Sequence, residues 1–261
     1  MAGIDPNQSP KEIMQLIAQA REKVGGEETA IGLVCEALEM YQDVMVNLFL
    51  EKCLIYHHIM MTERDNPGKK NKASAKEASR LWKKTLQDAE AYIDFYHLRR
   101  WRSRLYRFWG RWYDSQERFR KSVPYYKLAI KLAKQDPDWT QKGIPRWLEL
   151  EGFLGFASIT GGNVRKGLRQ LQKIYKKYDR GTGKSLRQKD YATWAIWKTG
   201  IPIWIGRAII SGKVKMEKRE YAKWLQEAEG LLSVPPGTKS WVKNFGFRKN
   251  EIAAIRRELK L

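Results

Sequence analysis

The sequence contains little cysteine and no long uninterrupted apolar run. Two cysteines among 261 residues exclude a disulfide framework and fit a reducing compartment. The most apolar stretch late in the chain, Trp194 to Ile210, is interrupted by Lys198 and Arg207. It is shorter than the run of about 20 apolar residues that a transmembrane helix requires. The N-terminus has no apolar segment of the kind that signal peptides contain. We therefore expect a cytoplasmic protein with no membrane partner.

Signals for strands and for active sites are also missing. No segment alternates strictly between apolar and polar residues, and no Asn-Gly pair marks a hairpin. The three histidines and two cysteines have no spacing that suits a metal ion. Neither a nucleophile elbow nor an H-E-x-x-H motif is present. We expect no enzymatic activity, no metal and no cofactor.

Basic and aromatic residues, in contrast, are abundant. The chain has 50 Lys plus Arg against 29 Asp plus Glu, a net charge of +21, and its 11 Trp and 43% hydrophobic content exclude a disordered chain. Residues 1–68 hold 5 basic and 11 acidic residues, whereas residues 69–261 hold 45 basic and 18 acidic ones. This asymmetry favours a polyanion partner for the basic part, with a charge that serves only solubility as the alternative.

Helical periodicity dominates the chain. Apolar residues recur at i, i+3, i+4 and i+7. A capping box at Ser9, with Pro10 and Glu12, begins a first helix that ends near Gly25. A second run extends to about Met61, and its length predicts a break near Asp43. After a loop over 64–73, helices are predicted over 74–95, 97–116, 119–134, 146–160, 164–179, 187–199, 201–211, 216–232 and 240–259.

Two segments share a spacing of small and large residues, which is how repeated helix pairs are detected. The first is centred on Gly110 and includes Tyr106, Tyr113, Phe119, Ser122, Tyr126 and Ala129. The second is centred on Gly155 and includes Gly162, Gly167, Leu171 and Ile174. Small residues let two antiparallel helices approach closely, and large ones fill the gaps around them.

These spacings resemble the tetratricopeptide repeat (TPR) family, clearly over 103–134 and fairly over 148–179. The resemblance implies an all-α fold in which antiparallel helix pairs stack as an α-solenoid, and an irregular helical bundle is the alternative. The chain would then form one domain over 1–261. Its parts are an N-terminal helix over 1–26, divergent helical pairs over 27–95, two TPR-like pairs over 96–180, and C-terminal helices with a cap over 187–261.

One candidate site is an arginine row, which consists of Arg100, Arg104, Arg107 and Arg111. These residues fall on one side of a predicted helix, and no acidic residue lies between Asp94 and Asp114. The planar guanidinium grips carboxylates and phosphates with two hydrogen bonds. We predict that the row binds an acidic protein or peptide; the alternative is that Asp88, Glu90 and Asp94 of the preceding helix neutralise it.

The TPR resemblance adds an expectation about the same row. In that family the first helix of each pair lines a concave groove, so Arg104, Arg107 and Arg111 match positions that commonly contact a peptide. The matching positions of the next copy are Glu149, Gly152 and Phe156, which cannot complete the family's Lys/Asn clamp for a terminal carboxylate. The resemblance therefore implies an acidic or phosphorylated segment rather than a chain terminus.

The second candidate site is a lysine-rich face on the predicted helix 164–179. The face consists of Lys166, Arg169, Lys173, Lys176, Lys177 and Arg180, opposite an apolar side, and only Asp179 opposes its charge. Lysine acts as a hydrated point charge, which suits phosphate contacts that do not depend on sequence. A merely solvated face is the alternative.

Together these features predict a non-enzymatic, TPR-like scaffold that presents a basic, aromatic-rich surface to an acidic protein or peptide. The alternative is a sequence-tolerant RNA- or DNA-binding protein that uses the lysine-rich face. A homo-oligomer formed through the acidic N-terminal region is a further alternative.

Overall fold

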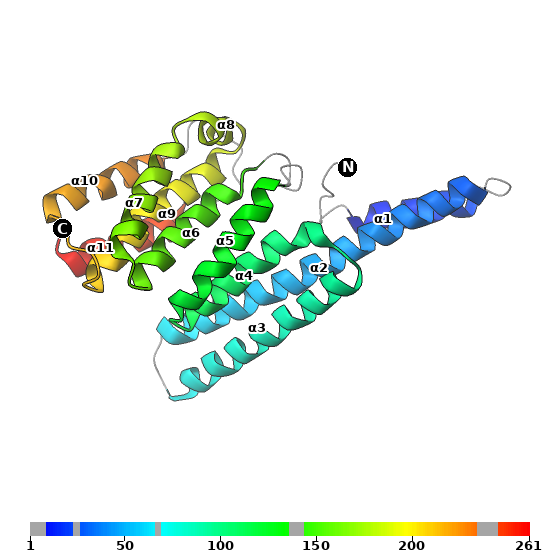
Figure 1. Cartoon of the computed structure of the whole chain (residues 1–261), viewed down its shortest axis with the longest axis horizontal. Helices are drawn as coiled ribbons and strands as arrows, with labels where there is room; N and C mark the ends of the chain where they lie inside the picture. The colour runs from blue at the N-terminus through cyan, green and yellow to red at the C-terminus, as the bar shows by residue number, and fades with distance from the viewer. Residues whose placement is uncertain (1–8, 23–26, 66–68, 136–143, 234–244) are drawn as a thin grey trace. The chain divides into compact units, whose positions relative to one another are not determined.

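The structure is a computed structural model that describes residues 9–22, 27–65, 69–135, 144–233 and 245–261. In these residues it contains α-helices, one 3₁₀ turn and no strand, so the all-α class is confirmed there (Figure 1). The chain divides into two compact units, residues 1–112 and 113–261. The boundary falls inside α4 (Arg102–Ser115), within the first predicted TPR-like pair.

Unit 1 is built on two long helices, α2 (Glu27–Asp65) and α3 (Lys69–Phe95), which lie side by side (Figure 1). α1 (Ser9–Glu22) packs along α2, and the 3₁₀ turn η1 (Arg99–Trp101) leads into α4. Fully buried side chains between these helices include Leu50, Trp82 and Leu86. Burial of such large apolar groups is the main stabilising contribution to a helical unit of this size.

The predicted break near Asp43 is wrong, because α2 continues unbroken from Glu27 to Asp65. The residues between Gly32 and Pro67 include neither glycine nor proline, so no residue there interrupts the helix. Packing along α3 stabilises a length that local propensity alone would not support. The predicted loop over 64–73 is also too long, because α2 reaches Asp65 and α3 begins at Lys69.

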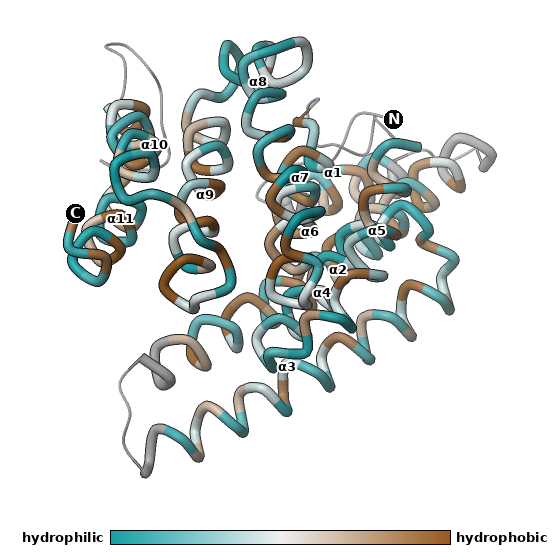
Figure 2. Tube along the Cα trace, turned by 60° about the vertical axis from the view of Figure 1, so that its left-hand side comes forward, coloured by the Kyte–Doolittle hydropathy of each residue, from teal (hydrophilic) through white to brown (hydrophobic). Residues whose placement is uncertain are grey.

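Unit 2 contains the remaining helices, which are arranged around α9 (Tyr191–Ile210). Three helices pack one against the next in chain order: α5 (Phe119–Gln135), α6 (Trp147–Thr160) and α7 (Val164–Lys177). Three others contact α9: α8 (Gly181–Lys189), α10 (Lys218–Leu231) and α11 (Gly246–Leu259). Most of α9 is buried, including Trp194 and Ile205, and Figure 2 shows its apolar stretches. A helix that is apolar on all sides must lie inside a bundle.

Most of two predicted helices, 187–199 and 201–211, forms the single helix α9, while residues 187–189 belong to α8. Asp190 begins α9 by accepting a hydrogen bond from the backbone N–H of Thr193 at 3.0 Å. Gly200 and Pro202 lie within α9 without ending it, because burial on every side outweighs their weak helix propensity. Gly181 and Gly183, which lie between the predicted helices 164–179 and 187–199, belong to α8. The last helix begins at Gly246; the earlier part of its predicted range, 240–244, lies outside the described residues.

The helix pair α6–α7 approaches closely at two glycines, as the sequence pattern around Gly155 predicts. A Cβ atom on Gly167 would lie 2.5 Å from the carbonyl oxygen of Gly155 and 2.7 Å from the backbone nitrogen of Ile159. A Cβ atom on Gly155 would lie 2.6 Å from the side chain of Leu171. Only glycine at these positions allows the two backbones this proximity.

We predict that Gly167→Ala destabilises the protein. Because the added methyl group would meet fixed backbone atoms, it should lower the free energy of unfolding by about 1–3 kcal/mol, as overpacking does. Gly230→Ala in α10 is the matched control, since a Cβ atom there would have no neighbour within 4 Å. Urea denaturation should show no loss of stability for that control. Equal losses in both variants would contradict the close helix contact.

The two cysteines are free and lie in different environments, because Cys35 is exposed and Cys53 is fully buried against the core of unit 1. Burial raises the pKa of the Cys53 thiol to about 12. At pH 8 only about one Cys53 in 10⁴ would be ionised, and the thiolate is the reactive form.

We predict that a thiol reagent modifies Cys35 rapidly and Cys53 only after denaturation. Rapid modification of both groups in the native protein would contradict this burial.

Candidate polyanion-binding surface

The arginine row faces α2 of unit 1. All four side chains are half-buried. Asp43 of α2 accepts hydrogen bonds from Arg100 Nη2 at 2.7 Å and from the indole nitrogen of Trp101 at 2.6 Å. The Arg104 Nη1 atom donates to the side-chain oxygen of Asn47 at 2.8 Å, and its guanidinium lies 3.5 Å from Glu51.

The rest of the row is also engaged inside the chain. The Nη2 atom of Arg111 lies 3.2 Å from Nε2 of His57, and the Arg107 guanidinium lies over the ring of Phe108. Of the carboxylates expected to neutralise the row, Asp94 pairs with Arg102 instead, at 2.6 Å. Carboxylates of α2, more than 50 residues earlier in the sequence, therefore pair with two members of the row, Arg100 and Arg104.

The lysine-rich face has a different environment. It lies on α7 and the turn after it, opposite Leu171 and Ile174, which are fully buried. Five of its six cations are exposed: Lys166, Arg169, Lys173, Lys176 and Arg180. No carboxylate in the described part of the chain lies within 4.0 Å of these five. Their charge faces solvent.

Lys177 is the exception in this set. It pairs with Glu151 of α6 at 3.1 Å, and Lys134 of α5 pairs with the same carboxylate at 2.8 Å. Both ammonium groups also lie near the ring of Trp147, at 5.2 and 4.9 Å from its centroid. Lys177 therefore links α7 to α6, and its charge is already paired with that of Glu151.

The carboxylate closest to the lysine-rich face in sequence, Asp179, is engaged elsewhere. The ammonium group of Lys198 on α9 is almost fully buried and donates to both Asp179 oxygens, at 2.7 and 2.9 Å. It also lies 4.6 Å from the ring centroid of Tyr175. Burial raises the pKa of the Tyr175 hydroxyl, so this ring remains neutral beneath the cation. Asp179 thus balances a buried charge.

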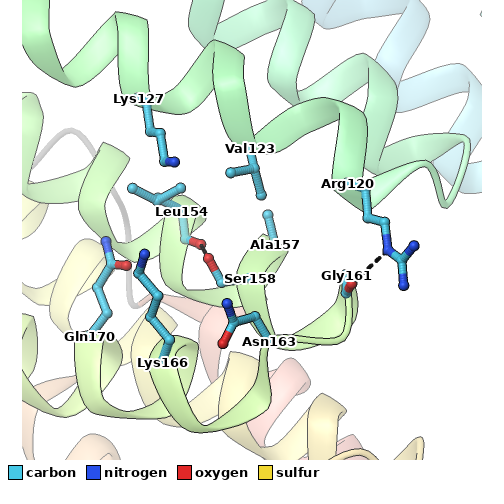
Figure 3. Close-up of a pocket in the computed structure, with 10 residues that line it drawn as sticks. All are labelled: Arg120, Val123, Lys127, Leu154, Ala157, Ser158, Gly161, Asn163, Lys166 and Gln170. Atoms are coloured by element: carbon cyan, nitrogen blue, oxygen red, sulfur yellow. Dashed lines mark hydrogen bonds between the residues drawn. The ribbon is translucent and has the colours of Figure 1, made fainter.

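A pocket lies beside the lysine-rich face, between α5, α6 and α7. It has a volume of about 290 Å³, and Lys166 contributes to both the pocket and the face. Figure 3 shows Lys127 and Lys166 near one end and Arg120 near the other, with the apolar Val123, Leu154 and Ala157 between them. The remaining lining residues are Ser158, Gly161, Asn163 and Gln170.

The lining of this pocket suits an anion that carries an apolar group. It contains three cations and no carboxylate. The Arg120 Nε atom donates to the carbonyl oxygen of Gly161 at 3.1 Å, which fixes the guanidinium at the rim (Figure 3). Asn163 precedes the first turn of α7 without capping it, and that end of a helix favours negative charge. Sequence reasoning missed the pocket, because three separate helices supply its walls.

Comparisons with protein-family models, with curated proteins and with solved structures found no match to the chain. Within the described residues, no group of three or more His, Cys, Asp or Glu is placed to hold a metal ion. None of the described helices has a stretch long and apolar enough to cross a membrane. The site therefore has to be interpreted from its own geometry and charge.

We predict that Asp43→Ala destabilises unit 1, because it removes the carboxylate that accepts hydrogen bonds from Arg100 and from the indole N–H of Trp101. The free energy of unfolding should fall by about 1–3 kcal/mol. Asp88→Ala is the matched control: Asp88 pairs with Lys84 on the surface of α3, and such a pair contributes about 0.5 kcal/mol or less. Chemical denaturation of both variants checks this. Equal effects would show that the arginine row does not depend on α2.

Proposed function

We propose that this chain is a non-enzymatic nucleic-acid-binding protein that contacts the phosphate backbone of RNA or DNA without reading its sequence. The contact surface is the lysine-rich face of unit 2 without Lys177, extended by Lys184, Arg187 and Lys189 of α8, which are also exposed. One observation supports the proposal above all others. Five neighbouring cations are exposed while the nearest carboxylates, Glu151 and Asp179, are paired with other lysines.

The spacing of these cations suits a polyanion. The exposed cations of α7, which are Lys166, Arg169, Lys173 and Lys176, are three or four residues apart, which is about 4.5–6 Å along a helix. A row of charges at that interval can contact several phosphates of one strand. Lysine and arginine contacts of this kind fix a protein on the backbone and carry no sequence information. The pocket beside Lys166 offers an apolar floor for one nucleotide and cations for its phosphate.

An acidic protein or peptide is the second candidate partner. It was predicted from the arginine row, but three of its four half-buried side chains, those of Arg100, Arg104 and Arg111, already contact α2, so the row favours this partner less. An acidic partner on the lysine-rich face would use the same cations as a nucleic acid. A binding experiment is therefore needed to distinguish a nucleic acid from an acidic protein as the ligand.

We also propose that the helix pairs stack in the TPR manner and that the protein is cytoplasmic. The close approach of Gly155 and Gly167 between α6 and α7 supports the repeat geometry. In TPR geometry α7 would be the second helix of its pair and would face the convex side. The two free cysteines fit a reducing compartment.

The test is a charge reversal on the exposed face. We expect the triple variant Arg169→Glu, Lys173→Glu and Lys176→Glu to weaken binding of a labelled single-stranded RNA at least about tenfold, because three phosphate contacts become repulsive. The control triple variant, Lys218→Glu, Arg219→Glu and Lys223→Glu, changes the net charge by the same amount at exposed residues of α10, which are not part of the proposed contact surface. It should retain most of the affinity. Fluorescence anisotropy measures both.

Two results would contradict the proposal. Equal weakening by both triple variants would show that only the total charge of the protein matters. Binding of a fluorescent poly-glutamate peptide by the full chain, without binding of RNA or DNA, would replace the nucleic acid with an acidic protein partner.

A further inference from the structure

α2 has a second apolar face that nothing in the described structure covers. One face packs into unit 1 through fully or nearly buried side chains such as Met40, Val46, Leu50 and Cys53. The other face exposes large apolar side chains to solvent, with exposed fractions of 38% to 62%: Ile31, Val34, Leu38, Tyr41, Leu48, Ile55 and Ile59. Exposed apolar surface of this extent marks an interaction site.

The exposed residues follow a strict interval. The seven exposed apolar residues form a regular series with the half-buried Met45 and the exposed Lys52. From Ile31 to Ile59, the members of this series are separated alternately by three and four residues. We name this set of nine residues the α2 seam. Alternation of three and four residues over four heptads is the spacing of the a and d positions of a coiled coil. It predicts a partner that is itself a helix with the same spacing.

The net charge of residues 1–68 argues against a membrane or a nucleic acid as the ligand of the α2 seam. Residues 1–68 carry a net charge of −6, so an anionic lipid surface or a nucleic acid would be repelled. A helix with a complementary apolar stripe can dock through apolar contacts, which must outweigh the charge repulsion where the partner is a second copy. The chain supplies one such helix itself, namely α2 of a second copy.

We infer that the α2 seam docks against the α2 seam of a second copy in antiparallel orientation, which makes a two-fold symmetric dimer. Lys52 decides the orientation. A parallel pair in register would place the Lys52 ammonium groups of both copies against each other, and like charges in an apolar layer are costly. Glu51, the carboxylate adjacent to Lys52, lies 3.5 Å from Arg104 and already has a cation nearby.

The antiparallel register pairs the eight seam positions from Val34 to Ile59 as a with d of the other copy, and Ile31 lies beyond these layers. Met45 then faces Leu48, Leu38 faces Ile55, and Val34 faces Ile59, all of which are apolar pairs. Lys52 faces Tyr41, whose ring accepts an ammonium group or its aliphatic stem. Every layer occurs twice, as an isologous two-fold interface requires. This inference does not depend on the proposed nucleic-acid function, since the seam lies in unit 1 and the lysine-rich face in unit 2.

The first experiment measures mass. Sedimentation of the full chain should give twice its 30.6 kDa at high protein concentration, with dissociation on dilution. Leu48→Glu with Ile55→Glu should give the monomer mass at the same concentration while circular dichroism shows unchanged helix content. Leu128→Glu on α5 is the control, because it places the same charge on an exposed leucine outside the seam, and it should stay dimeric. A monomeric wild-type protein at every concentration would overturn the inference.

The second experiment measures orientation by disulfide trapping. The exposed Cys35 is first replaced by serine, and two variants, Leu38→Cys and Ile55→Cys, are made with tags of different size. Antiparallel docking predicts that oxidation of the mixture traps the mixed dimer, while each variant alone traps little. Trapping of each variant with itself would show parallel docking and overturn the inferred arrangement.

Discussion

The surface of unit 2 depends on one buried charge, the ammonium group of Lys198. Burial of an unpaired cation is costly, so Lys198 needs carboxylates and ring faces around it. It obtains them from Asp179 at 2.7 Å, from Glu227 at 3.8 Å, and from the rings of Tyr175 and Trp194. Because Asp179 balances this interior charge, it does not offset the cations on α7. The contact between Lys198 and Asp179 therefore has two results: it neutralises a buried charge, and it leaves the cations on α7 without this carboxylate.

The sequence predicts helix boundaries correctly where local signals determine them. It does not predict them where tertiary packing determines whether a helix continues. The ranges of α5, α6 and α7 follow from apolar periodicity and from breakers such as Gly161, and the structure agrees within about two residues at each end. The predicted break near Asp43 failed because α3 supports α2 along its length, and the predicted break at Gly200 failed because α9 is buried on every side. A pattern of neighbouring residues in the sequence does not reveal such packing between helices.

The same distinction applies to the candidate sites. The lysine-rich face was predictable because a helix period alone places its cations on one side. The contacts of the arginine row with α2 were not predicted, although Asp43, Asn47 and Glu51 share the four-residue interval of Arg100 and Arg104 and were a usable signal. The pocket needed the structure, since α5, α6 and α7 each supply part of its wall. The α2 seam needed exposure data to separate it from the buried face of the same helix.

The central claim is that the exposed cations of unit 2 contact phosphates, and the salt dependence of binding tests it most directly. Affinity of the wild-type chain for labelled single-stranded RNA should be measured by anisotropy between about 50 and 200 mM salt. Five phosphate contacts predict a slope of log affinity against log salt near about −3.5, a loss of about 100-fold over this range. The absence of binding at the lowest salt, or an affinity that does not change with salt, would contradict the account.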